Sequence, residues 1–385
     1  MKTIINTEKL PIKIWATKED LVGYEEAITQ AVNLANHPLS RKWVCLMSDF
    51  HIGYGMPIGG VLATQGGVIP NAVGVDIGCG MIAAKTNLQA YDLSKEKLQE
   101  LRLEIHKRIP VGMRHHAEKQ NHAYLKVKST DPIISKQLEA ADYQIGTLGG
   151  GNHFIEIQYD GAGTVWIMIH SGSRNLGLKV ANYYHTIAKD YMDTFKSDIP
   201  DMDLAFLPDS VQEYRMYLDA MRFCMGFAEA SRESMFQQVK LAFEAQGFPF
   251  EEDLKFDTHH NFASMENHYG QNLLIHRKGA VKAEGLVTIP GSMGTASYIC
   301  EGLKPAESFN TCSHGAGRVL GRKQANATIT HDQAVESMQH VVFGIKQGDY
   351  DEMPMAYKDI EKVIEYQSDL VKPQYKLLPL AVCKG

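Results

Sequence analysis

The sequence predicts an α+β fold in which helices and β-sheets form one large domain over residues 1–385. Three observations support this. The chain has 44% hydrophobic and 22% charged residues, as ordinary globular proteins do. Short apolar segments between glycine turns predict strands, while longer segments with helical periodicity predict helices. No internal repeat or low-complexity linker divides the sequence, so a single domain is preferred over two separable ones.

The expected elements follow from local patterns. An amphipathic segment opened by Thr17-x-x-Asp20 resembles a helix with a capping box, and the apolar run Val44–Met47 has the length of a buried strand. Methionine and aromatic residues at helical spacing mark a long helix, for which core packing is the expected role. In order, we expect a helix at 17–36, a strand at 44–47, β-structure broken by turns up to 84, a helix at 93–107, strands at 146–158 and 165–170, a helix at 210–246, short strands with glycine turns up to 322, and a helix at 360–370.

Composition also restricts the setting of the protein. No apolar run approaches the roughly 18 residues of a membrane span, and the opening residues lack the apolar core of a signal peptide, so we expect a cytoplasmic protein. The six cysteines have no paired spacing, which favours free thiols or metal ligands over disulfides. The net charge of −6 argues against a protein that coats nucleic acid nonspecifically, although it permits a local basic groove.

A basic stretch between Arg108 and Lys128 is the place where such a groove could lie. Its composition fits either a solvated loop or a groove for a phosphate backbone. The basic and histidine side chains of this stretch are Arg108, Arg114, His115, His116, Lys119, Lys126 and Lys128.

Several glycine-rich segments carry side chains that can bind metal ions. Asp76 and Cys79 stand three residues apart between glycines, so that a carboxylate and a thiol could reach one small cluster of ions. His153 follows three consecutive glycines, His170 precedes a Ser-Gly-Ser turn, and the pair His259-His260 adds a further imidazole. Each could be structural on its own. Together they form the ligand set of a two-ion site that suits zinc, manganese, iron or cobalt rather than magnesium or calcium.

Two further side chains suggest phosphate chemistry beside such a site. Arg174 lies four residues after His170, in an expected loop with two hydroxyls, and a guanidinium matches phosphate oxygens bidentately. His314 lies in the small-residue segment His314–Arg318, which leaves room for a bulky ligand. A neutral imidazole beside metal-bound phosphates is a candidate nucleophile.

Seven segments in this order resemble the RtcB family of RNA ligases: GVDIGCGM, GTLGGGNHFIE, IHSGSRNLG, HHN, RKGA, PGSMGTASY and HGAGR, with a terminal VCKG. The resemblance runs from about Asp49 to the last residue. It implies a GTP- and manganese-dependent enzyme that joins RNA ending in a 3′-phosphate or 2′,3′-cyclic phosphate to RNA beginning with a 5′-hydroxyl, in RNA repair or tRNA splicing. It also implies β-sheets around a central cleft with two manganese ions.

The resemblance assigns roles to individual residues. Cys79 matches a ligand that bridges the two ions, and His260 rather than His259 matches a ligand because it directly precedes the asparagine. His314 matches the histidine that carries GMP, and Asp49 matches an acidic residue with a proposed role toward the 5′-hydroxyl. RNA phosphates are expected at Arg174 and near Arg114, and an archease-like activating protein is a possible partner. The implied metal ligands are Asp76, Cys79, His153, His170 and His260; the implied GTP contacts are Asn152, Phe154, Glu156, Ser292, Ser297, Ala316, Tyr357 and Lys384.

Some positions depart from the family pattern. His51-Ile52-Gly53 stands where His-Pro-Gly is usual, Met56 where an aromatic residue is common, and Gly321 where a serine is expected. None of these removes an expected ligand or the nucleophile, so they bear on RNA contacts and substrate choice. Two other classes stay open. One is a dinuclear phosphoesterase that opens cyclic phosphate ends without joining them, and the other is an RNA-binding module without catalysis. Consumption of GTP would separate a ligase from a phosphoesterase.

Overall fold

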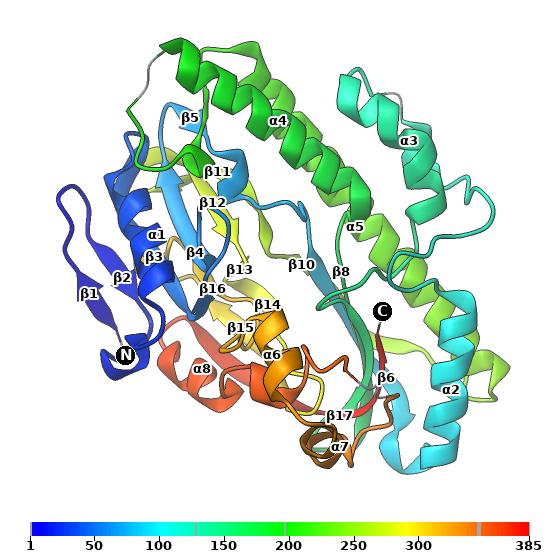
Figure 1. The fold of residues 1–385 in the computed structure, drawn as a ribbon. Coiled ribbons are helices and arrows are strands. Elements are labelled where there is room, and N and C mark those ends of the chain that lie inside the picture. Colours follow the sequence, from blue (N-terminus) through cyan, green and yellow to red (C-terminus); the bar gives the residue numbers. More distant parts are fainter. Residues whose placement is uncertain (1, 128, 196–197, 345–347, 385) are drawn as a thin grey trace.

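The computed structural model describes residues 2–127, 129–195, 198–344 and 348–384, and it contains two large β-sheets flanked by helices (Figure 1). Lys128 and Gly385, which end two of the motifs above, lie outside the described residues. The six-stranded sheet has the order β1 (Thr3–Ile5), β2 (Ile12–Ile14), β3 (Ser40–His51), β4 (Ile58–Thr64), β12 (Gln271–Lys278) and β11 (Asn261–His268). The seven-stranded sheet has the order β10 (Glu252–His259), β6 (Gly80–Gln89), β8 (Thr164–Ser171), β7 (Phe154–Tyr159), β17 (Val371–Lys384), β15 (Ser297–Leu303) and β14 (Glu284–Ile289).

Two strand pairs and a set of helices complete the described part of the chain. The pairs are β13 (Ala280–Lys282) with β16 (Thr311–Ser313), and β5 (Gly67–Val68) with β9 (Leu207–Pro208). The α-helices are α1 (Glu25–Asn36), α2 (Lys95–Arg108), α3 (Pro132–Gln144), α4 (Arg174–Phe195), α5 (Gln212–Ala245), α6 (Arg322–Thr328), α7 (His331–Met338) and α8 (Ile360–Tyr366). The 3₁₀ turns are η1 (Glu19–Leu21), η2 (Pro70–Ala72), η3 (Ala90–Asp92), η4 (Ala123–Lys126), η5 (Met202–Leu204), η6 (Ala306–Ser308) and η7 (Pro354–Ala356). One mixed and one antiparallel sheet, both flanked by helices, confirm the predicted α+β class.

The seven-stranded sheet is buried on both faces, and alternate residues of its strands pack in opposite directions. On β6, Ile82 and Ala84 join an apolar cluster with Phe236 and Val239 of α5, whereas Met81 and Ala83 belong to a cluster on the other side with Trp166. In Figure 1, α4 and α5 run side by side along one edge of the molecule, and α5 also packs against β6 and β8. The long helix therefore lies directly behind the strands that carry Cys79 and His170.

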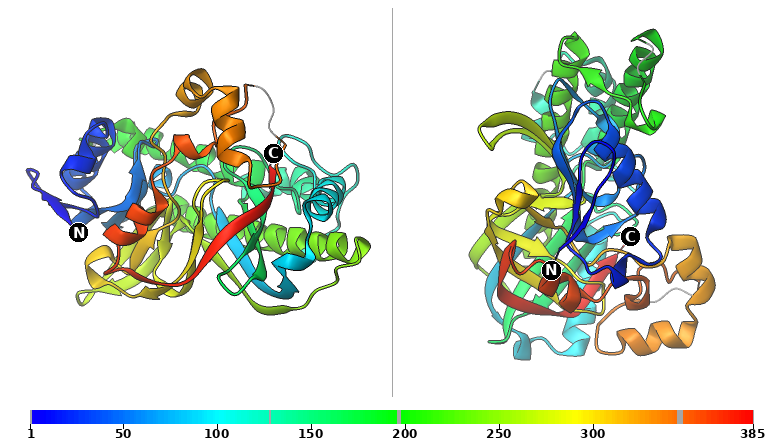
Figure 2. Two further views of the ribbon diagram at one scale, coloured as in Figure 1. Left: turned by 90° about the horizontal axis from the view of Figure 1, so that it is seen from below. Right: turned by 90° about the vertical axis from the view of Figure 1, so that its left-hand side faces the viewer.

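The six-stranded sheet connects the two halves of the core. On one face, Val44 and Leu46 of β3 pack against Ala31 and Leu34 of α1. On the other face, β3 and β4 share a cluster with β14 and β15 of the seven-stranded sheet, through side chains such as Val61 and Val287. The two sheets are therefore held together by apolar contact, which fixes the residues at their junction. Around this core, Figure 2 shows α6 and α7 protruding from the sheets in both views.

Most expected elements are confirmed with shifted ends. The expected strands at 44–47 and 165–170 are the centres of β3 and β8, and the expected helices at 93–107 and 210–246 are α2 and α5. The last expected helix, at 360–370, ends earlier than expected, because α8 stops at Tyr366.

Three expectations were wrong in ways that matter for the site. The first helix begins at Glu25 rather than Thr17, because the chain turns at Gly23 (φ +88°) and the capping contact between Thr17 and Asp20 closes only the turn η1. The strand expected from 146 begins only at Phe154, since positive φ angles at glycines such as Gly149 (φ +91°) form a loop. Arg174, expected in a loop, starts α4.

The chemical environment of the cysteines agrees with expectation. All six are buried and none is paired in a disulfide.

Among the helices of the described residues, none combines the length and the hydropathy that a membrane-spanning segment needs.

Candidate active site

Three buried side chains from adjacent strands converge at one point. The Cys79 sulfur, just before β6, lies 3.4 Å from Nε2 of His153 and 3.2 Å from Nε2 of His170. His153 immediately precedes β7, and His170 on β8 is paired in register with Phe154 of β7 and Met81 of β6. All three donor atoms lie within 4.8 Å of one another. The register of these strands therefore helps to bring together residues up to 91 positions apart in the chain.

The tautomers of the two histidines show what this point can accept. Nδ1 of His153 lies 3.0 Å from the Leu148 carbonyl, and Nδ1 of His170 lies 3.0 Å from the Asn152 carbonyl. Because a carbonyl only accepts, Nδ1 carries the hydrogen in each ring. Each Nε2 then directs a lone pair toward Cys79. Backbone carbonyls orient metal-binding imidazoles in the same way, so these residues fit a bound cation.

His260 and Asp76 extend this cluster on either side. Nε2 of His260 lies 3.4 Å from Nε2 of His170, and Nδ1 of His260 is buried with no hydrogen-bond partner among the described residues. An Asp76 oxygen lies 3.1 Å from Nε2 of His153, while its other oxygen accepts from the backbone N–H of Ser173 at 3.1 Å. The structure thus brings the five expected ligands into one cluster. Their assignment to two ions stays a prediction.

Burial determines the protonation of these groups. It holds the pKa of His170 and of His260 well below the usual range and raises the pKa of the Cys79 thiol. Burial also disfavours ionised Asp76, but the neighbouring His153, Cys79 and Arg174 together outweigh it and leave the pKa of Asp76 lowered. The cluster therefore contains the neutral imidazoles of His170 and His260 beside a carboxylate. A bound cation would compensate these electron pairs and remove the thiol proton.

His314 stands next to this cluster and is held by a buried carboxylate. It follows β16, and its ring centroid lies 4.7 Å from that of His260. Nδ1 of His314 lies 2.7 Å from an oxygen of Asp49, which is fully buried on β3. The same oxygen accepts from the backbone N–H groups of His314 at 3.1 Å and Gly315 at 3.3 Å. Because Nδ1 is engaged, Nε2 is the ring nitrogen left for chemistry.

Glycines make this arrangement possible. Gly317 has φ +76°, and a Cβ there would lie 2.0 Å from the Asp49 carbonyl oxygen. Gly59 has φ +79°, and its Cβ would lie 2.8 Å from the second carboxylate oxygen of Asp49. The small residues after His314 therefore serve close packing against Asp49, in addition to leaving space for a ligand.

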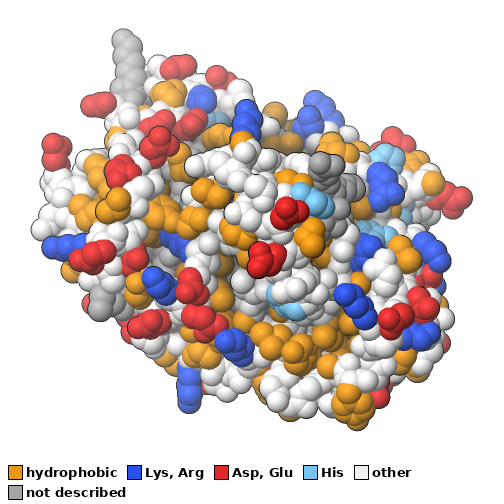
Figure 3. Space-filling model, turned by 60° about the horizontal axis from the view of Figure 1, so that its bottom comes forward, with side chains coloured by type: hydrophobic (Ala, Val, Ile, Leu, Met, Phe, Trp, Pro, Cys, Tyr) orange, Lys and Arg blue, Asp and Glu red, His pale blue; other side chains and the backbone are white. Residues whose placement is uncertain are grey.

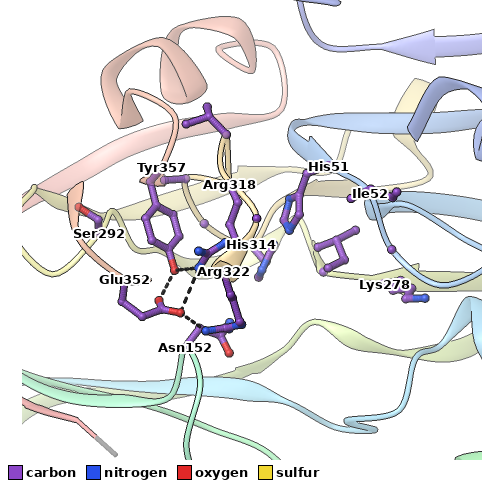
Figure 4. Close-up of a pocket in the computed structure, with 18 of the residues that line it drawn as sticks. His51, Ile52, Asn152, Lys278, Ser292, His314, Arg318, Arg322, Glu352 and Tyr357 are labelled. Carbon is purple, nitrogen blue, oxygen red and sulfur yellow. Dashed lines mark hydrogen bonds and ion pairs between the residues drawn. The ribbon is translucent and has the colours of Figure 1, made fainter. Parts of the chain in front are cut away.

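His314 and four of the five cluster residues line a cavity of about 1150 Å³; His153 is the cluster residue outside its lining. Figure 4 shows His314 between two groups of residues. The lining residues include seven of the eight expected nucleotide contacts, which we call the nucleotide wall: Asn152, Phe154, Glu156, Ser292, Ala316, Tyr357 and Lys384. Three of them, Asn152, Ser292 and Tyr357, lie in one group in Figure 4. Ser297, the eighth expected contact, is the exception. It lies behind the wall, where its hydroxyl accepts from Nε2 of Gln158 at 3.0 Å, and Gln158 also donates to Glu156.

Sequence reasoning missed a charged network that lies among the residues lining this cavity. Glu352 is buried, and its carboxylate lies 3.0 Å from Nη1 of Arg318 and 3.2 Å from Nζ of Lys384. Arg322 and the hydroxyl of Tyr357 also donate to Glu352 (Figure 4). Glu352 lies in a polar stretch without a motif, so no sequence signal marked it. Arg318 was visible only as part of HGAGR.

The other group of residues includes His51, Ile52 and Lys278 (Figure 4). None of these three was expected to bind a metal ion or the nucleotide. Nζ of Lys278 donates to the carbonyl of Tyr54 at 2.6 Å and to that of Asn71 at 3.0 Å, and burial lowers the pKa of Lys278 to about 7. The Tyr54 side chain remains 75% exposed at the cavity mouth. The face in Figure 3 carries lysine and arginine side chains as well as hydrophobic, acidic and histidine ones. On this side of the cavity, hydrogen bonds from Lys278 therefore hold the backbone at Tyr54 and Asn71, while the Tyr54 side chain is open to solvent.

The two arginines expected at RNA lie elsewhere. Arg174 donates through Nη2 to the Gly112 carbonyl at 2.7 Å and through Nε to the Thr147 hydroxyl at 3.1 Å, so its fork braces the glycine loop before His153. Arg114 is exposed. Within the described part of the chain, neither lines the cavity. An RNA role for these two residues stays a prediction.

Comparison with known proteins gives a consistent picture. The profile of a family described as "tRNA-splicing ligase RtcB" matches residues 30–138 and 117–385. The chain is 37% identical to the RNA-splicing ligase RtcB of Escherichia coli K12 over 415 aligned positions that span 99% of each protein. It is 33% identical to the RNA-splicing ligase RtcB of Mycobacterium tuberculosis, over 92% of this chain and all of the relative. Identity to the tRNA-splicing ligase RtcB of Methanococcus maripaludis is 32%, over 94% and 92%.

Substitution of Gly172 tests whether Asp76 belongs to the metal centre. A Cβ at Gly172 would lie 2.1 Å and 2.3 Å from the two carboxylate oxygens of Asp76, so Gly172→Ala must displace that side chain. We expect the Kd for Mn²⁺, measured by calorimetry, to rise roughly tenfold or more. Gly161→Ala is the control, because nothing lies within 4 Å of a Cβ there. Equal Mn²⁺ affinity in both variants would exclude Asp76 as a ligand.

Proposed function

The chain belongs to the RtcB family, and from this we propose that it is an RNA ligase that uses GTP and manganese to join RNA 3′-phosphate or 2′,3′-cyclic phosphate ends to 5′-hydroxyl ends. One observation carries the proposal most strongly. A histidine aligned by a buried carboxylate stands 4.7 Å, ring to ring, from a cluster of Cys, His and Asp donors. This constellation supplies a nucleophile beside a cation site, which group transfer at a phosphate requires.

In the first step, Nε2 of His314 attacks the α-phosphate of GTP, and the bond to the β-phosphate breaks to release pyrophosphate. The imidazole becomes positively charged as the phosphorus–nitrogen bond forms. Asp49 accepts the Nδ1 hydrogen at 2.7 Å, so it orients the ring and stabilises that charge. Bound manganese ions would neutralise charge on the phosphates. This assigns Asp49 to the nucleophile, rather than to the RNA 5′-hydroxyl that the resemblance suggested.

In the next steps, GMP passes from His314 to an RNA 3′-phosphate, and a 5′-hydroxyl then attacks that phosphate and releases GMP. A cyclic end must first be hydrolysed to a 3′-phosphate. In-line attack places the incoming hydroxyl opposite the leaving GMP. Since the nucleotide wall lies on one side of His314, the 5′-hydroxyl strand would approach from the side of His51 and Lys278 (Figure 4).

Guanine recognition is assigned to Glu156, which is buried on β7 in the nucleotide wall. Burial raises the pKa of Glu156 to about 8, against the opposing influence of the Gln158 hydrogen bond and the Lys384 charge. An ionised Glu156 can accept from N1–H and the N2 amino group of guanine, a pattern that adenine lacks. Adenine would leave this buried acceptor unpaired, so the pocket would select GTP over ATP.

The setting of the reaction is part of the same proposal. The substrate is RNA with the ends named above, in repair or tRNA splicing, and the enzyme acts in the cytoplasm. An archease-like protein as activator is a prediction that rests on the family alone.

The direct test of the function is a joining assay with an RNA that ends in a 3′-phosphate and one that begins with a 5′-hydroxyl, with Mn²⁺ and with or without GTP. We expect a joined product only when GTP is present. A phosphoesterase would instead open a cyclic end and consume no GTP, and the pairing of Asp49 with His314 would then have no task. That outcome would contradict the ligase assignment.

Removal of the nucleophile should separate metal binding from group transfer. His314→Ala deletes the imidazole but none of the five donor side chains, so we expect no covalent GMP and no joining. Mn²⁺ affinity, measured by calorimetry, should change by less than about threefold. Full ligation by this variant would refute His314 as the GMP carrier.

The Asp49 carboxylate can be tested without a change of size. Asp49→Asn keeps a hydrogen-bond acceptor but removes the charge that stabilises the imidazolium. We expect the rate of covalent GMP formation, followed in single-turnover experiments, to fall on the order of a hundredfold or more. A rate within about twofold of the unchanged protein would show that the Asp49 charge has no part in this step.

The raised pKa of Glu156 predicts a pH dependence. Below about pH 8 the free carboxyl is neutral, so guanine binding must release its proton, and GTP affinity should rise as pH increases toward about 8 and then level off. Calorimetry in buffers of different ionisation enthalpy should detect this proton release near neutral pH. Glu156→Gln should abolish this component and reduce the preference for GTP over ATP. Unchanged proton release in Glu156→Gln would assign the titration to another group.

A further inference from the structure

Arg232 is a fully buried arginine on α5 whose fork is entirely used inside the protein. Its Nε and Nη2 atoms donate to the two oxygens of Asp257 on β10, at 2.6 Å and 2.7 Å. A buried guanidinium is tolerated because this carboxylate pairs with it bidentately. The pair stands directly behind the seven-stranded sheet, on the side of the sheet where α5 packs.

The remaining donors of Arg232 contact the chain neighbours of the proposed ligands. Nη1 donates to the Gly78 carbonyl at 3.1 Å and to the Ser171 carbonyl at 2.7 Å. Gly78 directly precedes Cys79, and Ser171 directly follows His170. His259, which directly precedes His260, donates from Nδ1 to the same Gly78 carbonyl at 3.0 Å, because a carbonyl only accepts, and Nη2 of Arg232 lies 3.3 Å from that nitrogen.

The packing around these contacts leaves little room for adjustment. A Cβ at Gly78 (φ +73°) would lie 2.6 Å from the Met225 Cα of α5, and a Cβ at Gly80 would lie 2.2 Å from the Thr258 carbonyl and 3.1 Å from Nη2 of Arg232. The turn that carries Cys79 is therefore pressed against both α5 and β10. A lysine at position 232 could form single hydrogen bonds but could not span three segments with one planar group.

We propose that Arg232 is a positioning residue for the metal centre, whose guanidinium fixes the segments carrying Cys79, His170 and His260 relative to one another. This inference rests on the proposed metal site. It follows from geometry, because three ligands from separate strands keep a common focus only if their backbones cannot shift independently. Arg232 donates to the backbone carbonyls beside Cys79 and His170, and it pairs with Asp257 on β10, the strand that ends directly before His260. Within the described residues, Arg232 does not line the cavity, so a direct contact with a substrate is not part of its proposed role.

The experiment compares Arg232→Lys with a matched control, Arg277→Lys. Arg277 is also fully buried, forks onto the carboxylate of Glu266 and donates to the Phe309 carbonyl at 2.8 Å. Its hydrogen-bond partners adjoin none of the proposed ligands. Both substitutions remove a planar fork from a buried ion pair, so a general loss of stability should appear in both. Only the Arg232 variant should change the metal centre.

Co²⁺ alone is the probe, because its visible bands and its sulfur-to-metal charge-transfer band report the geometry and the Cys79 bond. Circular dichroism first establishes the temperature at which each variant is folded without metal. We expect Arg232→Lys to bind Co²⁺ with roughly ten- to hundredfold lower affinity and with shifted bands. Arg277→Lys should keep the affinity and spectrum of the unchanged protein.

The outcomes separate this inference from the proposed function. An unchanged Co²⁺ spectrum and affinity in folded Arg232→Lys would overturn the positioning role, as would equal losses in both variants. Failure of the unchanged protein to bind Co²⁺ would overturn the metal site itself. If Arg232→Lys does not fold, Asp257→Asn tests the same interaction, because it removes the charge of the carboxylate that pairs with Arg232. Several-fold weaker Co²⁺ binding with shifted bands is then expected. Unchanged binding by Asp257→Asn would refute the role.

Discussion

The candidate site depends on the junction between the two large sheets, where His260 separates β10 of one sheet from β11 of the other. The backbone N–H of His260 donates to the Cys79 carbonyl at 2.9 Å, and that of Gly78 donates to the Asn261 carbonyl at 2.8 Å. These two bonds tie the turn before β6 to the crossing point. Ligands on or next to strands of the seven-stranded sheet thus meet His260, which lies at the crossing, and Arg232 contacts the same junction from the side of α5.

The second constraint is electrostatic. Three imidazoles, a thiol and a carboxylate are packed together where burial keeps His170 and His260 neutral. Their lone pairs converge without enough protons to satisfy them, so the chemistry of the site calls for a cation. Placed beside such a cation, His314 needs only to be oriented and kept unprotonated at Nε2. The buried Asp49 carboxylate orients the ring by engaging Nδ1. Nε2 is then the ring nitrogen left for chemistry, and the two groups of cavity residues lie on either side of His314.

The side chains that the sequence motifs marked come together in the structure, and these residues were recognisable because they stand beside glycines in distinctive segments. All five expected ligands, together with Asp49 and His314, lie in or beside the cavity. Long periodic elements such as α5 were also predictable, whereas the start of α1 and the loop at 146–153 were not, since positive φ angles at glycines override the local pattern. Residues whose role arises only from tertiary contact could not be found in this way. Glu352 lies in an ordinary polar stretch, and Arg232 in a helix whose pattern indicated only core packing. The single domain predicted for residues 1–385 stays a prediction.

The central claim is that His314 becomes covalently linked to GMP beside the metal cluster. The most direct test is incubation of the unchanged protein with Mn²⁺ and GTP labelled at the α-phosphate, followed by denaturation and mapping of the protein-bound label. The account predicts a label that is lost in acid, as a phosphorus–nitrogen bond requires, and that maps to the peptide containing His314. Absence of any adduct from protein shown to bind Mn²⁺, or a label on another residue, would contradict it.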